Sequence, residues 1–180
     1  MIVMPEEMLD VVDENDKVTG RDTRKNVHNK GFWHRGIHVI ILNRKGEMLL
    51  QLRSPGKEQY PNAYDLSVSE HVGSGESYWK AVRRGLREEL GITGARPEKL
   101  LHFRMNYGNP GDNMVGVIYE LRFDGKLKID KREIQAVKFT GTDRIKKMVR
   151  DGKEKKKFSY WTYEILRWYF RMPSRVEKIG

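Results

Sequence analysis

The chain has 180 residues, 38% of them hydrophobic, which is enough to bury one core and excludes a disordered polypeptide. It has no cysteine, so disulfides, thiolate zinc sites and cysteine nucleophiles are excluded. No apolar run approaches the roughly 20 residues that a membrane-spanning helix needs. The first ten residues lack the pattern of a secretory signal. We therefore expect a cytoplasmic protein without a membrane partner.

The formal net charge of +10 suits either a nucleic acid or a small polyanionic ligand. The basic residues are spread along the chain and interleaved with acidic ones, apart from a run at 153–157. This distribution disfavours a nucleic acid as the principal ligand and favours a small molecule. The sequence does not indicate an oligomeric state.

Apolar runs and alternating segments, bounded by turn residues, predict most of the secondary structure. Strands are expected at 8–12, 18–24, 37–42, 47–53, 64–69, 99–107, 114–123, 126–129 and 134–139. The Asp124-Gly125 pair predicts a hairpin, and 27–35 reads as a connector. Helices are expected from Gly75 to Gly91, at 142–149 with a Thr142 cap, and at 158–170, where an aromatic stripe is typical of core.

This mixture of strands and helices predicts an α/β fold, an α/β/α sandwich with a mixed sheet. We expect a single domain over 1–180, with N-terminal strands and a connector in 1–35 and a C-terminal helix and tail in 153–180.

The stretch from 70 to 92, EHVGSGESYWKAVRRGLREELGI, is the most informative part of the sequence. Helical spacing places Glu88 and Glu89 on one edge of the predicted helix, with Ala81 and Gly85, facing a glycine-rich turn at 71–75. Two carboxylates on a rigid helix suit a hard divalent cation such as Mg²⁺. The alternative is a solvated helix edge, because 33% of the chain is charged.

The same stretch resembles the Nudix box. Seven of nine fixed positions are matched, by Glu76, Arg84, Leu86, Glu88, Glu89, Gly91 and Ile92. Glu70 stands where the box has its first glycine, and Gly85 where it has a glutamate that is often a metal ligand. The resemblance implies the Nudix α/β/α sandwich, with Glu88 and Glu89 as catalytic metal ligands. Arg84 is expected to orient carboxylates through a bidentate ion pair.

Gly85 is unusual, because a glycine inside a helix costs about 1 kcal/mol relative to alanine. Its missing side chain either makes room for a bulky substrate or leaves the metal one carboxylate short.

Within the superfamily, nearly the whole chain is similar to type I isopentenyl diphosphate isomerases. Segments that carry this resemblance include VHNKGFWHRGIHVIIL, MLLQLRSPGK and YPNAYDLSVSEHV. Ser69 stands where the isomerase has its catalytic cysteine. His28, His34 and His71 look like its metal-binding histidines, so His71 is a predicted metal ligand, whereas Asp112 and Met114 stand where two glutamates would be. The alternative is that these are polar loop histidines. His38 and His102 are expected to be core or sheet residues.

Arg53 and Lys57 match isomerase positions near the diphosphate, and their side chains suit phosphate oxygens. We therefore predict a Nudix hydrolase, a pyrophosphatase that uses Mg²⁺, or Mn²⁺, to cleave a diphosphate linkage in a nucleoside diphosphate derivative or related small molecule. The general base is left open among Glu133, Glu120 and Asp112. Two alternatives remain: an isomerase-like enzyme, and a binding module of the same fold with weak catalysis.

Overall fold

The computed structural model describes residues 6–106 and 113–180, so Asp112 and most of the loop at 108–113 lie outside the described residues. The elements, in chain order, are β1 (Met8–Val12), β2 (Val18–Thr23), α1 (Arg24–Lys30), β3 (His34–Leu42), β4 (Met48–Arg53), β5 (Tyr64–Asp65), β6 (Val68–His71), α2 (Tyr78–Leu90), β7 (Glu98–Asn106), β8 (Asn113–Arg122), β9 (Ile134–Thr140), α3 (Thr142–Asp151), a 3₁₀ turn (Lys155–Lys157), α4 (Tyr160–Tyr169) and β10 (Glu177–Lys178).

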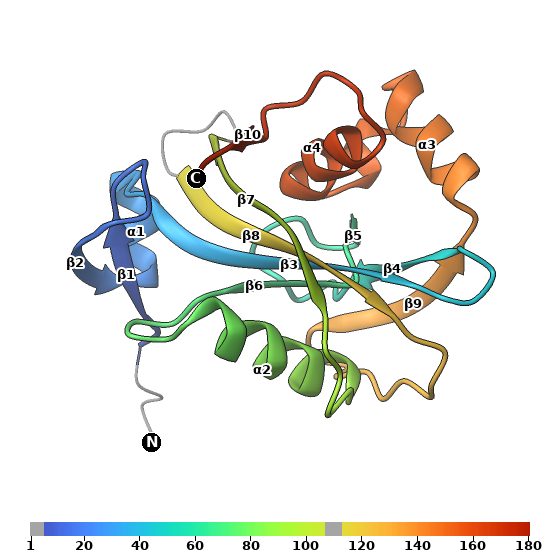
Figure 1. The fold of residues 1–180 in the computed structure, drawn as a ribbon, viewed down its shortest axis with the longest axis horizontal. Helices are drawn as coiled ribbons and strands as arrows, with labels where there is room; N and C mark the ends of the chain where they lie inside the picture. The colour runs from blue at the N-terminus through green and yellow to red at the C-terminus, as the bar shows by residue number, and fades with distance from the viewer. Residues whose placement is uncertain (1–5, 107–112) are drawn as a thin grey trace.

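The centre of the fold is a mixed sheet. Strand β3 pairs in parallel with β8 along its whole length, and antiparallel with β6. Strand β8 also pairs antiparallel with β7, and β4 extends the sheet toward β9. Helix α2 covers one face of the sheet, and α3 and α4 cover the other (Figure 1). The predicted α/β/α sandwich with a mixed sheet is confirmed.

Each face of the sheet has its own hydrophobic core. Against α2, the fully buried side chains include Val82, Leu86 and Leu90, which recur at helical spacing. Against α3 and α4, the core includes Phe103 and Ile165. The aromatic stripe of α4 belongs to this second core, as the sequence predicted.

The structure corrects three local predictions. The segment expected to be only a connector forms α1, where the Thr23 hydroxyl accepts a hydrogen bond from the backbone N–H of Asn26 and Gly31 ends the helix in a left-handed conformation. Residues 126–129 form no strand, because their backbone instead contacts the end of α2, where Lys128 N–H donates to Leu90 O at 2.9 Å. Thr142 is not a cap, since Gly141 holds that position without a side-chain bond.

At Gly85, helix α2 packs closely on β6. A Cβ atom at this position would lie 2.8 Å from Val68 Cγ1 and 3.3 Å from Glu70 Cγ. The space is therefore filled from the strand, and the idea that Gly85 makes room for a bulky substrate is wrong. Close helix–sheet contact is the local reason for this glycine.

We expect Gly85→Ala to destabilise the fold by about 1 kcal/mol, despite the better helix propensity of alanine. Val68 is fully buried and short, so it cannot move away from the new methyl group. Urea denaturation of wild type and variant measures the difference. A stabilised Gly85→Ala variant would show that the packing at this point is loose.

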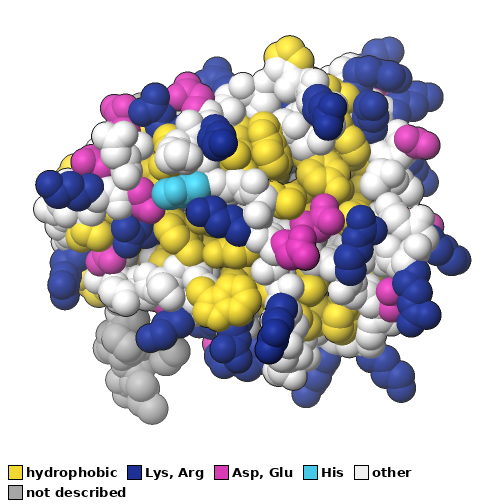
Figure 2. Space-filling model, viewed as in Figure 1, with side chains coloured by type: hydrophobic (Ala, Val, Ile, Leu, Met, Phe, Trp, Pro, Cys, Tyr) yellow, Lys and Arg dark blue, Asp and Glu magenta, His cyan; other side chains and the backbone are white. Residues whose placement is uncertain are grey.

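The surface is charged without a single dominant basic field on the face that is seen in Figure 2. Lys and Arg side chains are scattered across it and alternate with Asp and Glu. Among residues 6–106 and 113–180, no helix is both long and apolar enough to cross a membrane.

Candidate active site

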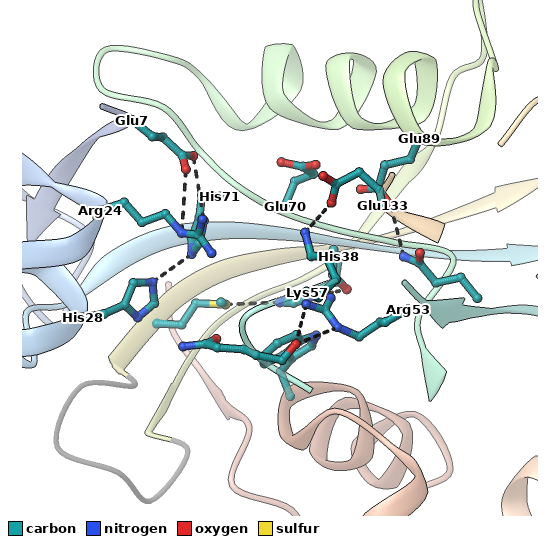
Figure 3. A pocket seen from close by; sticks show the side chains of 15 residues that line it. Glu7, Arg24, His28, His38, Arg53, Lys57, Glu70, His71, Glu89 and Glu133 are labelled. Carbon is teal, nitrogen blue, oxygen red and sulfur yellow. Dashed lines mark hydrogen bonds and ion pairs between the residues drawn. The ribbon is translucent and has the colours of Figure 1, made fainter. Parts of the chain in front are cut away.

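A polar cavity of about 200 Å³ opens between α2, the central strands and the loop that follows β4. Carboxylates from α2 and β6 line one side, and basic side chains line the other (Figure 3). Its lining includes Glu70, Glu89, Glu133, Arg24, Arg53, Lys57, Gln51, His28, His38 and His71. This combination of acidic and basic side chains suits metal-assisted phosphate chemistry.

Glu89, at the C-terminal end of α2, is one of two predicted metal ligands, with His71, that line the cavity. Its side chain is only 4% exposed. Oε2 accepts a hydrogen bond from Gln51 Nε2 at 3.1 Å, whereas no donor among the described residues is directed at the buried Oε1. Glu70, on β6, lies next to Glu89 in the same cavity (Figure 3). A buried carboxylate oxygen without a donor fits a hard cation.

The two carboxyl groups are electrostatically coupled. Burial, and then the neighbouring Glu70 charge, raise the pKa of Glu89 well above its usual value. Burial also raises the pKa of Glu70, although the adjacent Arg84 guanidinium opposes the rise. Without a cation, the pair therefore tends to retain a proton.

The sequence suggested that Glu88 and Glu89 lie together in one site, but the structure places only Glu89 in the cavity. The Glu88 side chain is 51% exposed and pairs with Arg87 Nη2 at 3.0 Å, on the outer edge of α2. The helical wheel predicted one shared edge, but successive helical residues differ by about 100° in direction, and the cavity accepts only one of the two. The glycine-rich turn also lies elsewhere, at the N-terminal end of α2, where Gly73 N–H donates to Glu76 at 2.9 Å.

Arg84 forms the predicted bidentate ion pair. Its Nε and Nη2 donate to the two oxygens of Glu76, both at 3.0 Å. Nη2 also donates to His71 O at 2.8 Å, and Nη1 to Glu70 Oε2 at 3.2 Å. Arg84 therefore connects the start of α2 to β6 and fixes the Glu70 side chain. It is not among the cavity-lining residues, so it positions carboxylates and does not contact the contents of the cavity.

The two predicted phosphate ligands both line the cavity, but they are held differently. Arg53 is 8% exposed, donates to Asp65 Oδ2 at 2.8 Å and to Gln59 O at 2.9 Å, and lies over the Trp161 ring. Lys57 forms an ion pair with Glu133. Arg53 lies over one face of the Trp161 ring, and Trp161 also lines the cavity.

A chain of hydrogen bonds runs beneath the cavity. The Ser69 hydroxyl donates to Asp65 Oδ1 at 3.0 Å, and His38 Nδ1 lies 3.0 Å from Ser69 Oγ. Because the Ser69 proton is directed at Asp65, Nδ1 of His38 carries the proton that it donates to Ser69. His38 Nε2 faces Met114 Sδ at 3.1 Å. His38 is a buried strand residue, as predicted, and it also lines the cavity.

We expect His38 to make the protein less stable at acidic pH. Burial lowers the pKa of His38 to about 4, and the Asp65 charge only partly opposes this. Between about pH 6.5 and 4 the unfolded chain binds a proton that the folded protein does not, so stability falls as the pH falls, by up to about 1.4 kcal/mol per pH unit. Denaturation of wild type and His38→Gln in EDTA across this range measures the slope. Equal slopes would show that the pKa of His38 is the same in the folded and the unfolded chain.

The three predicted metal-binding histidines meet at the other end of the cavity. His28 comes from α1, His34 from β3 and His71 from β6, and their ligand nitrogens lie within 4.8 Å of one another. His28 Nε2 is 3.3 Å from His71 Nε2. Burial and the neighbouring His34 lower the pKa of His71 well below its usual value, which keeps its imidazole neutral. These are therefore not separate loop histidines.

The candidate general bases are separated by the fold. Glu133 lines the cavity beside Lys57, whereas Glu120 accepts a hydrogen bond from Tyr169 Oη at 3.0 Å and does not line the cavity. Asp112 lies outside the described residues. The position of Glu133 favours it among the described candidates.

Residues 32–168 match the NUDIX domain, which is more than half of the chain. The chain belongs to the Nudix family. It is 43% identical over 102 residues to an uncharacterized Nudix hydrolase of Clostridium acetobutylicum, which covers 55% of this chain and 48% of that relative. The predicted hydrolase class is thereby confirmed.

The relation to isomerases is also confirmed. The chain is 28% identical over 179 residues to human isopentenyl-diphosphate delta-isomerase 2, covering 87% of this chain and 79% of that one. Among solved structures, a Deinococcus radiodurans protein superposes with a TM-score of 0.76 at 26% identity, covering 90% of this Nudix chain and 98% of the other.

Sequence reasoning missed Gln51, which lines the cavity, and Asp65, which is buried beneath it. No motif marks either residue, and their partners are seen only in the folded chain. Glu70 was noted only as a departure from the Nudix box, and that departure was the signal for its role.

Proposed function

We propose that this Nudix protein hydrolyses a diphosphate linkage in a small molecule, a nucleoside diphosphate derivative or a related compound, with Mg²⁺ or Mn²⁺. The observation that carries the proposal is the buried Glu89, with a carboxylate oxygen that lacks a donor, in a cavity that also presents Arg53 and Lys57. Oxygen ligands suit the divalent cations that Nudix enzymes generally use.

In this proposal Glu89 is the metal ligand inside the cavity and His71 is a ligand at the histidine cluster, whereas Glu88 stays at the exposed edge of α2 and does not contact the cation in the cavity. When held by Glu89, Mg²⁺ would supply polarisation of the diphosphate and would lower the pKa of an attacking water. Arg53 and Lys57 orient the phosphate oxygens. Arg53 retains free N–H donors beyond its bonds to Asp65 and Gln59, because a guanidinium has five. We assign the role of proton acceptor to Glu133, which lines the cavity in an ion pair with Lys57.

A panel of diphosphate compounds tests the proposal. Nucleoside diphosphate sugars, dinucleotide polyphosphates, ADP-ribose and nucleoside di- and triphosphates are incubated with the protein and Mg²⁺, Mn²⁺ or EDTA, and the products are separated by chromatography. We expect at least one compound to be cleaved between phosphates, with the cleavage lost in EDTA. Binding of these compounds without turnover would instead establish a binding module, and cleavage that survives EDTA would exclude the metal.

We expect no conversion of isopentenyl diphosphate to dimethylallyl diphosphate. Ser69 stands where the isomerase has its cysteine, and its hydroxyl is committed to Asp65 and His38. A serine hydroxyl does not supply the thiolate that proton exchange with an unactivated double bond requires. Chromatography of the reaction detects the product, and Ser69→Cys shows whether the thiol alone is missing. Conversion by wild type at a rate comparable with hydrolysis would contradict this prediction.

A further inference from the structure

The cavity contains a second carboxylate that the Nudix box does not predict. Glu70 lies on β6, and its carboxyl group reaches Glu89 on α2 (Figure 3). Its side chain is 24% exposed, so it is accessible from the cavity without being free in solvent. The carboxyl groups of Glu70 and Glu89 are thus in contact, although they come from two different elements.

Position 85 explains why the carboxylate comes from the strand. The box places a glutamate there, but a Cβ on Gly85 would meet Glu70 Cγ at 3.3 Å and Val68 Cγ1 at 2.8 Å. The stem of Glu70 therefore occupies the space that a side chain from α2 would need. The two departures from the box are therefore sterically linked, because Glu70 on β6 leaves room only for a glycine at position 85 on α2.

We propose that Glu70, together with Glu89, binds the divalent cation, so that β6 supplies the carboxylate that α2 lacks at position 85. This inference rests on the proposed function, because it assigns a second ligand to the same cation. Two adjacent carboxylates carry a formal charge of −2, which a divalent cation balances. The orphaned oxygen of Glu89 then has a partner.

The alternative is that Glu70 only forms a structural ion pair with Arg84. Arg84 does not depend on Glu70, because its guanidinium already makes a bidentate pair with Glu76 and a bond of 2.8 Å to His71 O. Its bond to Glu70 is the longest of the four, at 3.2 Å. Arg84 therefore acts as a positioning residue that directs Glu70 toward Glu89.

Binding of Mn²⁺ to the metal-free protein, followed by electron paramagnetic resonance, tests the proposal without any substrate. Wild type is compared with Glu70→Gln, Glu70→Asp and Glu89→Gln. The matched control is Glu98→Gln, the same change at an exposed strand residue that does not line the cavity. Melting temperatures in EDTA are recorded for every variant.

We expect Glu70→Gln to raise the Kd for Mn²⁺ by at least about tenfold, Glu70→Asp by less, and Glu98→Gln by less than about twofold. In EDTA, Glu70→Gln melts no lower than wild type, because the amide still accepts from Arg84 and the buried like charge is gone. A weaker affinity for Mn²⁺ without a lower melting temperature is expected if Glu70 is a metal ligand. It is not expected if Glu70 only forms a structural ion pair.

Two results would overturn the inference. The first is wild-type Mn²⁺ affinity in Glu70→Gln while Glu89→Gln binds weakly, which leaves the proposed function intact. The second is a weakened Kd in Glu70→Gln together with a lower melting temperature in EDTA, which assigns Glu70 to the fold. If wild type itself binds no Mn²⁺, the proposed function fails, and this inference with it.

Discussion

Replacement of Glu89 by glutamine is expected to abolish metal-dependent hydrolysis and leave the fold in place. The change removes the buried charge that faces the proposed cation, which should cost several kcal/mol of transition-state stabilisation, or about 10³-fold in kcat/KM. The amide has the same shape, can still accept from Gln51, and can donate to Glu70. Stability in EDTA should therefore be equal to that of wild type or higher.

The measurement is product formation by wild type, Glu89→Gln and Glu88→Gln on the compound that the panel identifies. Because Glu88 lies exposed beside Arg87, we expect its replacement to reduce turnover much less. The exposed Glu98→Gln change should have no effect. Turnover near the wild-type rate in Glu89→Gln would remove Glu89 from the mechanism.

Replacement of Asp65 by alanine should produce the largest loss of stability, about 3–5 kcal/mol. Asp65 is fully buried and accepts hydrogen bonds from five groups: Arg53 Nη1, Ser69 Oγ, Leu66 N–H, Trp161 Nε1 and Thr162 Oγ1. Its loss leaves the buried Arg53 guanidinium without a counter-charge, and several donors without an acceptor.

Urea denaturation of wild type and Asp65→Ala measures this loss, with Asp151→Ala as a control at an exposed aspartate. For a chain of this length the melting temperature should fall by about 10 °C. Because Arg53 is expected to orient phosphate, residual enzyme should also show a higher KM. A loss below about 1 kcal/mol would show that solvent replaces the Asp65 network readily.

Much of the fold follows from the sequence, because apolar periodicity controls it. Helix α2 and the central strands have strong apolar patterns, and their ends lie close to the predicted ones. Helix α1 was missed because only Val27 is buried in it, so it has no apolar stripe. The hairpin expected at Asp124-Gly125 failed because the next residues contact α2 and β9 pairs with β4.

The candidate site was predictable only in part. Motif spacing gave Glu89, Arg53 and Lys57, which all line or enter the cavity. It could not separate Glu88 from Glu89, since both lie near the edge of the same apolar face. The partnership of Glu70 with Glu89 depends on the contact between β6 and α2, which no local pattern encodes.

The most direct test of the account is the position of a divalent cation in the protein. Crystals soaked in Mn²⁺ are measured near the manganese absorption edge, and an anomalous difference map locates the ion. We predict a peak inside the cavity, between the carboxylates of Glu70 and Glu89. A peak only at the cluster of His28, His34 and His71, or only beside the exposed Glu88, would contradict it.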